Sequence, residues 1–490
     1  MRVLSADLWE PAPGLLITWD VTPGAGQVPE PAPITFNQRN HLLGTAHGEP
    51  SVWITAAFDV EGPVDVLALE EAFRDLVARH PGLQTEAVRR PPGQASDVGL
   101  VRHDPGTLVW QLADGPVTRT VAATREHLVG ELGRRCAPFG YPAFLPAVIS
   151  RPDRSTVLLG MDHLHTDAWS TTVVVDELAA AYAEHARYAA ARVPALAGAV
   201  AAGAAGFGNV AGARPTVVVR PTAAAASALP VVGPAYVGVD DPRLATWHGF
   251  LRERGWALPT FPLPLGVPDG ERVPQRTVVR SLADSATAGA VAGRAAGAGA
   301  STSAAVLATF ARAVADLGGP TVLETLLPVH TRADETAHRA VGWHTTTVPL
   351  RIEVDAPVPA GARAGMITDT VTDIAIAATG KALRAARELS AVPLQQLVET
   401  LPHPLRFPRR DIFQVSYLDY RRLPGHAAAA ERRAHHVSAA TRADDLQVWV
   451  SRTDDGLAVR ARMPRTDVAV RTVDALLDRW ADHLAELATG

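Results

Sequence analysis

A short apolar run that ends in a cluster of polar residues constrains this chain more than any other feature. Residues 157–161 have the length and apolar character of a buried strand, and Asp162-His163-Leu164-His165-Thr166-Asp167-Ala168 follows directly. From Trp169 onward, apolar residues recur every three or four positions, which predicts a helix. A histidine between a buried strand and a helix has a fixed backbone and can direct its imidazole into a cleft. We therefore expect the active site to be built around His163.

Length and composition narrow the functional classes. The chain has 490 residues, 20% of them charged, with a formal net charge of −5, which allows two domains of more than 200 residues. Nucleic acid is not an expected partner, because binding phosphates needs a basic surface. The single cysteine, Cys136, excludes an internal disulfide framework, and residues 1–7 lack the apolar core of a signal peptide. We expect a cytoplasmic monomer without stable membrane insertion.

Composition also suggests how the chain is divided. Residues 1–32 are rich in Pro and Gly and are interpreted as an extended N-terminal arm, and residues 191–235 as an Ala/Gly/Pro-rich linker. Between and after them, residues 33–190 and 236–490 form two halves in which predicted strands and helices alternate. The alternation predicts an α/β (α+β) fold, in which strands at 144–149 and 156–161 lead into the His163 block.

Several blocks resemble the chloramphenicol-acetyltransferase-like superfamily. His163, Asp167 and Ala168 resemble its His-x-x-x-Asp-Gly signature. Further blocks follow in the order expected for the superfamily: 33–40, 79–85, 261–266, 327–332, 341–343 and 413–419. Together they resemble the polyketide-associated acyltransferases and the condensation domains of peptide synthetases. Condensation domains usually carry a second His where this chain has Asp162, and the difference favours a stand-alone acyltransferase.

The resemblance implies a fold and a set of site residues. The fold would be two chloramphenicol-acetyltransferase-like halves in a V-shaped pseudo-dimer, with an active-site tunnel between them and His163 midway. Asp167 would be structural and would pair with an Arg of the second half, for which we expect Arg332 and, as the alternative, Arg351. Four residues are candidates for the tunnel lining: His165, Trp343, Thr346 and Ser416.

The chemistry expected of such a tunnel is acyl transfer from a thioester. A neutral imidazole can accept the proton of the acceptor, so His163 is the expected general base, without a covalent intermediate. The chain has no His-Glu-x-x-His, Walker or Gly-x-Ser-x-Gly motif, and we expect neither a metal nor a bound cofactor. The expected donor is a phosphopantetheine thioester, on coenzyme A or on an acyl or peptidyl carrier protein, and the acceptor a small molecule.

The sequence leaves three functions open. The first is an acyltransferase that forms an ester or amide on a hydroxyl or amine acceptor in lipid or specialised-metabolite biosynthesis. The second is a stand-alone condensation enzyme that joins two carrier-bound substrates through an amide. The third belongs to another class: a catalytically silent module that docks other enzymes. Relatives of that kind usually lose the His or the Asp of the signature, whereas His163 and Asp167 are both present here.

Overall fold

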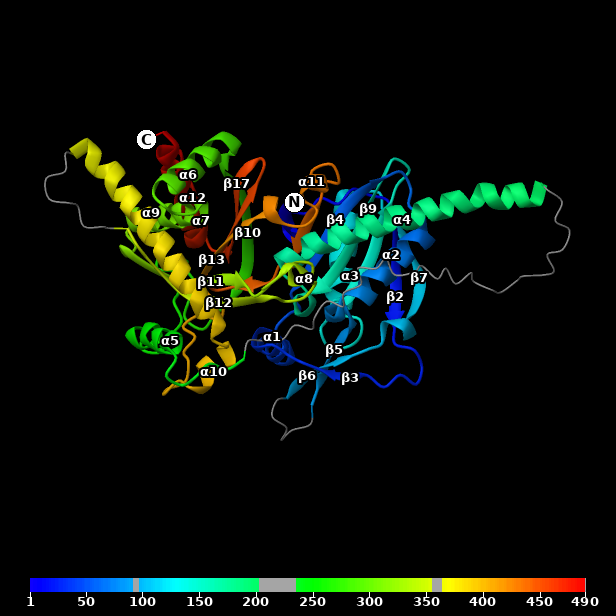
Figure 1. The fold of residues 1–490 in the computed structure, drawn as a ribbon, viewed down its shortest axis with the longest axis horizontal. Coiled ribbons are helices and arrows are strands. Elements are labelled where there is room, and N and C mark those ends of the chain that lie inside the picture. Colours follow the sequence, from blue (N-terminus) through cyan, green and yellow to red (C-terminus); the bar gives the residue numbers. More distant parts are fainter. Residues whose placement is uncertain (91–96, 202–234, 355–363, 490) are drawn as a thin grey trace.

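The computed structural model describes residues 1–90, 97–201, 235–354 and 364–489. These residues form two lobes, each built on a seven-stranded sheet, and a small three-stranded sheet (Figure 1). We call the lobe that carries the His163 block the N-lobe and the other the C-lobe. The mixed α/β architecture with two lobes agrees with the fold expected from the sequence.

The N-lobe sheet has the strand order β1-β14-β4-β9-β8-β2-β7, and all neighbours are antiparallel except the parallel pair β1–β14. Helices α2 and α4 bury one face of the sheet and α3 the other, because each presents an apolar stripe. The strands are β1 (Arg2–Ser5), β14 (His435–Ser438), β4 (Trp53–Glu61), β9 (Arg154–Asp162), β8 (Phe144–Ser150), β2 (Leu15–Thr22) and β7 (Val109–Val117). The helices are α2 (Val66–Arg79), α3 (Val121–Arg135) and α4 (Ala168–Ala201).

The C-lobe sheet has the order β12-β11-β13-β16-β17-β10-β15, with parallel pairs at β11–β13 and β13–β16. One continuous core joins this sheet to helices α5, α6, α7, α9 and α12. The strands are β12 (Thr345–Glu353), β11 (Val322–His330), β13 (Gln414–Asp419), β16 (Gln447–Thr453), β17 (Gly456–Pro464), β10 (Val273–Asp284) and β15 (Arg442–Ala443). The helices are α5 (Pro242–Glu253), α6 (Ser285–Gly297), α7 (Thr302–Asp316), α9 (Ala364–Glu388) and α12 (Asp467–Thr489).

Short elements connect these layers. The three-stranded sheet has the order β3-β6-β5 and lies below the N-lobe in Figure 1, next to α1. Its strands are β3 (Glu30–Ala32), β6 (Val98–Arg102) and β5 (Thr85–Arg89). The remaining α-helices are α1 (Phe36–Ala46), α8 (Glu335–His338), α10 (Leu394–Glu399) and α11 (His426–Ala429). The 3-10 turns are η1 (Ala6–Leu8), η2 (Pro81–Gln84), η3 (Pro105–Thr107), η4 (His163–His165), η5 (Leu389–Ala391) and η6 (Tyr420–Arg422).

The expected N-terminal arm, residues 1–32, does not stay apart from the body. Strand β2 is an inner strand of the N-lobe sheet, where it pairs with β7 and β8. Its sequence, Leu-Leu-Ile-Thr-Trp-Asp-Val-Thr, is rich in the β-branched and aromatic residues that favour strands. That local propensity outweighs the Pro and Gly on either side, on which the interpretation as an arm rested.

The first part of the expected linker, residues 191–201 of 191–235, is helical in the structure. Helix α4 continues to Ala201, because the sequence there is dominated by alanine, the residue with the highest helix propensity. Residues 202–234 of this segment lie outside the described residues. Within the described ranges, no helix is both long enough and apolar enough to cross a membrane.

One strand crosses between the two halves of the sequence. β14 belongs to the second half, yet it lies between β1 and β4 in the N-lobe sheet. Val437 pairs with Thr55, which is 382 positions earlier in the chain. The lobes are therefore not two consecutive stretches of sequence.

Candidate active site

The His163 block forms the predicted strand, turn and helix. The strand β9 ends at Asp162, and the 3-10 turn η4 begins at His163. The His163 backbone N–H donates to the Val52 carbonyl at 2.8 Å, which fixes the turn against the segment preceding β4. Asp162 caps the turn by accepting the Leu164 N–H at 2.9 Å. The backbone of the histidine is thus held from both sides.

The imidazole of His163 lies where the lobes meet. It stacks on the indole of Trp343, a C-lobe residue, with ring centroids 3.9 Å apart and planes 31° apart. Its Nδ1 is buried and has no hydrogen-bond partner among the other described residues. Burial lowers the pKa of His163 below its usual value, and the neighbouring His41 lowers it further, against opposing effects of the residue's own carbonyl and of Asp162. The ring is therefore neutral at physiological pH.

Asp167 forms the inter-lobe ion pair predicted with Arg332. Two guanidinium nitrogens of Arg332 donate to the two carboxylate oxygens at 2.8 and 3.0 Å, and both side chains are buried. The carboxylate also accepts the backbone N–H groups of Ser170 at 2.8 Å and His344 at 3.0 Å. Burial would raise the pKa of Asp167, but Arg332 outweighs it and the pKa falls to about 2. The alternative partner, Arg351, instead pairs with Glu253 and Glu324.

A second histidine stands beside the first. His41, on α1, is bonded through Nε2 to the Asp162 carboxylate at 2.7 Å. Its ring centroid is 6.5 Å from that of His163 and 5.9 Å from that of Trp343. Asp162 is fully buried and also accepts the Ser51 hydroxyl at 3.0 Å. At the position where condensation domains usually carry a histidine, this chain has Asp162. Its carboxylate is bonded to the imidazole of His41, which lies on α1.

Sequence reasoning did not single out His41. Its partner is 121 positions away, and α1 has no marked apolar stripe that would show which side of the helix faces the site. The one signal in the sequence was Asp162 itself, which stands where condensation domains usually carry a histidine. A buried carboxylate needs hydrogen-bond donors, and a histidine was a possible one.

Two of the four candidates for the tunnel lining are placed elsewhere. His165 is buried, and its Nδ1 bonds the Gly82 carbonyl at 2.7 Å inside the N-lobe. The strand β9 ends at Asp162, so His165 lies in the turn η4 and not on a continuing strand. Ser416 lies on β13, which bonds β11 through the single pair Leu326–Gln414. It is not among the residues that line the cavity between the lobes.

A cavity of about 230 Å³ lies between the lobes, and Trp343 and Thr346 do line it. Because Trp343 also stacks on His163, the cavity and the imidazole share one indole ring as a boundary. The remaining lining residues come from both lobes: Ile34, Thr35, Phe36, Asn37, Arg39, Tyr236, Thr331, Thr345, Pro393, Leu394 and Gln395. The lining mixes apolar surface with hydroxyl, amide and guanidinium groups, as small-molecule sites do.

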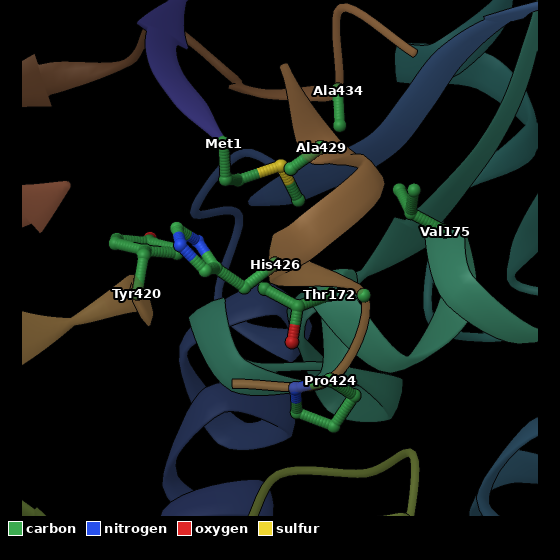
Figure 2. Close-up of a pocket in the computed structure, with 9 residues that line it drawn as sticks. Met1, Thr172, Val175, Tyr420, Pro424, His426, Ala429 and Ala434 are labelled. Carbon is green, nitrogen blue, oxygen red and sulfur yellow. The ribbon is translucent and has the colours of Figure 1, made fainter. Parts of the chain in front are cut away.

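A second cavity, of about 10 Å³, lies near the first turns of α4 (Figure 2). The side chains of Met1, Tyr420 and His426 converge on it. A volume of this size holds about one water molecule. It is too small for a substrate. In the part of the chain that the structure describes, no group of three or more His, Cys, Asp or Glu residues could hold a metal ion.

No family model matches the chain. Among curated proteins, it is similar to the 2'-acyl-2-O-sulfo-trehalose (hydroxy)phthioceranyltransferase PapA1 of Mycobacterium tuberculosis (strain CDC 1551 / Oshkosh). The two are 24% identical over 509 residues, which cover 98% of this chain and 88% of PapA1. The acyltransferase PapA3 of M. tuberculosis (strain ATCC 25618 / H37Rv) is 25% identical over 246 residues, 48% of each chain.

Solved structures agree with the sequence relatives. The PapA2 acyl transferase superimposes with a TM-score of 0.77 at 20% identity, covering all of both chains. The condensation domain of the Monacolin K polyketide synthase MokA superimposes with a TM-score of 0.61 at 14% identity, covering 95% of this chain and 98% of the domain. The resemblance found in the motifs is confirmed: the chain is homologous to the PapA acyltransferases, has the two-lobed condensation-domain fold, and is an enzyme of the acyltransferase class.

Proposed function

We propose that this protein moves an acyl group from a thioester to a hydroxyl or amine acceptor, in lipid or specialised-metabolite biosynthesis, with His163 as general base. The observation that carries the proposal is the position and state of His163. Its ring lies between the lobes, its pKa is lowered by burial, and it touches Trp343 at the edge of the inter-lobe cavity. A neutral imidazole in that position can accept a proton from a bound acceptor.

The proposed reaction is a direct transfer. His163 takes the proton of the acceptor O–H or N–H while the heteroatom attacks the thioester carbonyl carbon. The carbonyl oxygen becomes an oxyanion; when it re-forms the carbonyl, the carbon–sulfur bond breaks and the thiolate receives the proton from the imidazolium. Since Nδ1 of His163 is buried, Nε2 is the nitrogen that meets the substrate. Holding both substrates at one place supplies much of the rate.

The proposed substrates follow from the relatives. A donor thioester on coenzyme A or on a carrier protein fits both the PapA enzymes and the condensation domains, and a cytoplasmic location fits such donors. The name of PapA1 describes transfer onto a sulfated trehalose, that is, onto a sugar hydroxyl. A hydroxyl acceptor is therefore our first choice for this chain.

A second candidate function rests on a different match. Over 164 residues the chain is 32% identical to the phosphinothricin tripeptide synthetase PhsB of Streptomyces viridochromogenes (strain DSM 40736 / JCM 4977 / BCRC 1201 / Tue 494), which corresponds to 31% of this chain and 13% of PhsB. This match to a peptide synthetase favours amide formation between carrier-bound substrates. That reaction would require phosphopantetheinylated carrier protein and would fail with free coenzyme A thioesters.

The docking alternative also has a structural counterpart. The X-domain from teicoplanin biosynthesis, solved in complex with OxyB, superimposes with a TM-score of 0.56 at 20% identity and covers 95% of each chain. The intact His163 and Asp167 favour catalysis over docking. A docking module would bind its partner enzyme and show no turnover with any donor–acceptor pair.

The test is turnover with a panel of acyl thioesters and hydroxyl or amine acceptors. We expect His163→Ala to fold as the wild type does and to lose roughly 10²–10⁴ in turnover, the usual contribution of a general base. His47→Ala is the matched control, because His47 is exposed at the end of α1 and bonds only the Leu43 carbonyl. Undiminished turnover in His163→Ala would remove His163 from the mechanism. A stable acyl adduct on the wild type, seen by intact-protein mass spectrometry, would replace direct attack with a two-step route.

A further inference from the structure

The inter-lobe cavity contains one charged side chain. Of the residues that line it within the described part of the chain, Arg39 alone is ionised at neutral pH. Arg39 lies in the first turn of α1, on the N-lobe side of the cavity, and Gln395 of α10 faces it from the C-lobe (Figure 1). Nη1 of Arg39 donates to Oε1 of Gln395 at 2.8 Å.

The other edge of this guanidinium has no partner. Nε of Arg39 is buried and bonds nothing among the described residues. The charge of Arg39 contributes to lowering the pKa of Glu399, after the hydrogen bonds that Gln395 and Tyr236 make to that carboxylate. Glu399 is the acidic residue nearby, but its carboxylate is held by the Tyr236 hydroxyl, at 2.8 Å, and by the Gln395 amide. A buried donor without an acceptor is unfavourable, and an acceptor on a bound ligand is one way to satisfy it.

The free edge has a defined chemical preference. Nε and Nη2 of an arginine form a planar fork of two parallel N–H groups, which matches the two oxygens of a carboxylate, phosphate or sulfate. A cavity of about 230 Å³ holds the volume of several waters, at about 30 Å³ each, so an oxyanion fits with part of the molecule that carries it. Phe36 and Leu394 offer apolar surface for that part, and the hydroxyls of Thr331 and Thr346 offer further hydrogen bonds.

We propose that Arg39 binds an oxyanion of one substrate, a phosphate, sulfate or carboxylate group, in the inter-lobe cavity through its guanidinium group. The inference rests on the proposed acyl transfer and deepens it, since the cavity shares Trp343 with His163. The oxyanion belongs either to the phosphopantetheine of the donor or to an anionic acceptor. Arg39 acts in binding and takes no part in proton transfer.

The deciding experiment measures the binding of inorganic phosphate and inorganic sulfate to the full chain by isothermal titration calorimetry. We expect Arg39→Gln to weaken binding roughly tenfold or more, because hydrogen bonds to a charged group contribute about 1.5–3 kcal/mol. The affinity of Arg39→Lys for these ions should lie between those of the wild type and Arg39→Gln, since lysine keeps the positive charge but lacks the planar guanidinium. Arg351→Gln is the control, because Arg351 lies outside the inter-lobe cavity and is held in an ion pair with Glu253.

Two results would overturn the proposal. One is equal affinity of the wild type and Arg39→Gln for both ions. The other is a wild type that binds neither ion at millimolar concentrations. Because binding is measured without turnover, in the wild type and in His163→Ala alike, a wrong assignment of the base leaves this result unchanged. Thermal melting of each variant shows whether it is folded.

A second arm assigns the oxyanion to a substrate. Octanoyl-pantetheine and octanoyl-4'-phosphopantetheine differ only in the phosphate. If Arg39→Gln weakens binding of the phosphorylated thioester alone, the donor supplies the oxyanion. If Arg39→Gln loses the inorganic ions but binds both thioesters as the wild type does, the acceptor supplies it. Either result supports the site.

Discussion

Asp162 and Asp167 stand on either side of His163, and they tie it to different lobes. Asp162 holds His41 and the Ser51 hydroxyl, both of the N-lobe. Asp167 holds Arg332 and the His344 N–H, both of the C-lobe. Each carboxylate is buried, and each is satisfied by several donors.

The two anchors differ in what pH can do to them. Arg332 keeps its charge throughout the pH range of any enzyme assay, so the Asp167 anchor is permanent. The Asp162 anchor rests instead on a hydrogen bond with an imidazole, which is not a permanent cation. The comparison suggests that one aspartate fixes the lobes and the other adjusts the electrostatics around the base. Four predictions test that division, starting with the largest expected effect.

Asp167→Ala should destabilise the protein by about 3–5 kcal/mol and abolish turnover, because it leaves the buried Arg332 guanidinium without its counter-charge. The double variant Asp167→Ala/Arg332→Ala should cost less than the sum of the two single variants. The unfolding free energy in urea measures both. As a control, Arg351→Ala breaks a solvent-exposed pair and should cost at most about 1 kcal/mol. Wild-type stability in an inactive Asp167→Ala would place Asp167 in the chemistry instead.

Asp162→Ala should cost less, about 1–3 kcal/mol, because it leaves a neutral donor, the Leu164 N–H, unpaired, whereas the Ser51 hydroxyl keeps the Cys136 carbonyl as its acceptor. The His41 ring also loses its partner, so adding His41→Ala to Asp162→Ala should cost little more. Chemical denaturation of the two single variants and the double variant gives the coupling. Fully additive costs would mean that the contact between the two side chains contributes no stability.

Lowering the pH should remove the contribution of the Asp167–Arg332 ion pair to the stability of the fold. The folded-state pKa of Asp167 is lowered to about 2 from 3.8, so its contribution is present above about pH 4 and is lost as pH falls toward 2. We expect about 2 kcal/mol of stability to disappear across this window. Unfolding free energies of wild type and Asp167→Asn between pH 5 and pH 2 isolate the effect, since Asn cannot titrate. If the unfolding free energies of the wild type and Asp167→Asn fall in parallel between pH 5 and pH 2, the ionisation of Asp167 contributes nothing to stability and the prediction is wrong.

The smallest effect concerns the pH profile of turnover. His41 lowers the pKa of His163, whereas Asp162 raises it, so His41→Asn should raise the pKa of His163 on both counts. A protonated imidazole cannot act as a base, and the acid limb of kcat/KM should therefore move to higher pH. His47→Asn should leave the profile unchanged. If the acid limb of kcat/KM does not move in His41→Asn, then His41 does not influence the pKa of His163.

The sequence could predict whatever depends on local pattern or on a linear motif. The strand pair before His163 and the helix after it follow from apolar periodicity. The Asp167–Arg332 pair follows from the family resemblance, because both residues lie in recognisable blocks. The sequence left open whether His165 lines the tunnel or finishes the turn, and the structure places it in the 3-10 turn η4 with Nδ1 bonded to the Gly82 carbonyl.

Features that depend on long-range packing were beyond the sequence. The His41–Asp162 bond joins residues of unrelated segments, and nothing in α1 marks His41 as facing the site. The free edge of Arg39 is a property of its surroundings, since Gln395 occupies only one side of the guanidinium. The sequence placed Arg39 within a family-like block but gave no sign that its Nε would have no hydrogen-bond partner among the described residues.

The position of β14 has a consequence for how the protein is made. The contact between Thr55 and Val437 spans 382 residues, which a ribosome adds in roughly 20–75 s at about 5–20 residues per second. Through that interval, the edge of β4 that will receive β14 has no partner, and β1 has no neighbour to pair with. Unpaired strand edges invite pairing with other chains. The nascent N-lobe is therefore an incomplete sheet with open strand edges until residue 438 has left the ribosome.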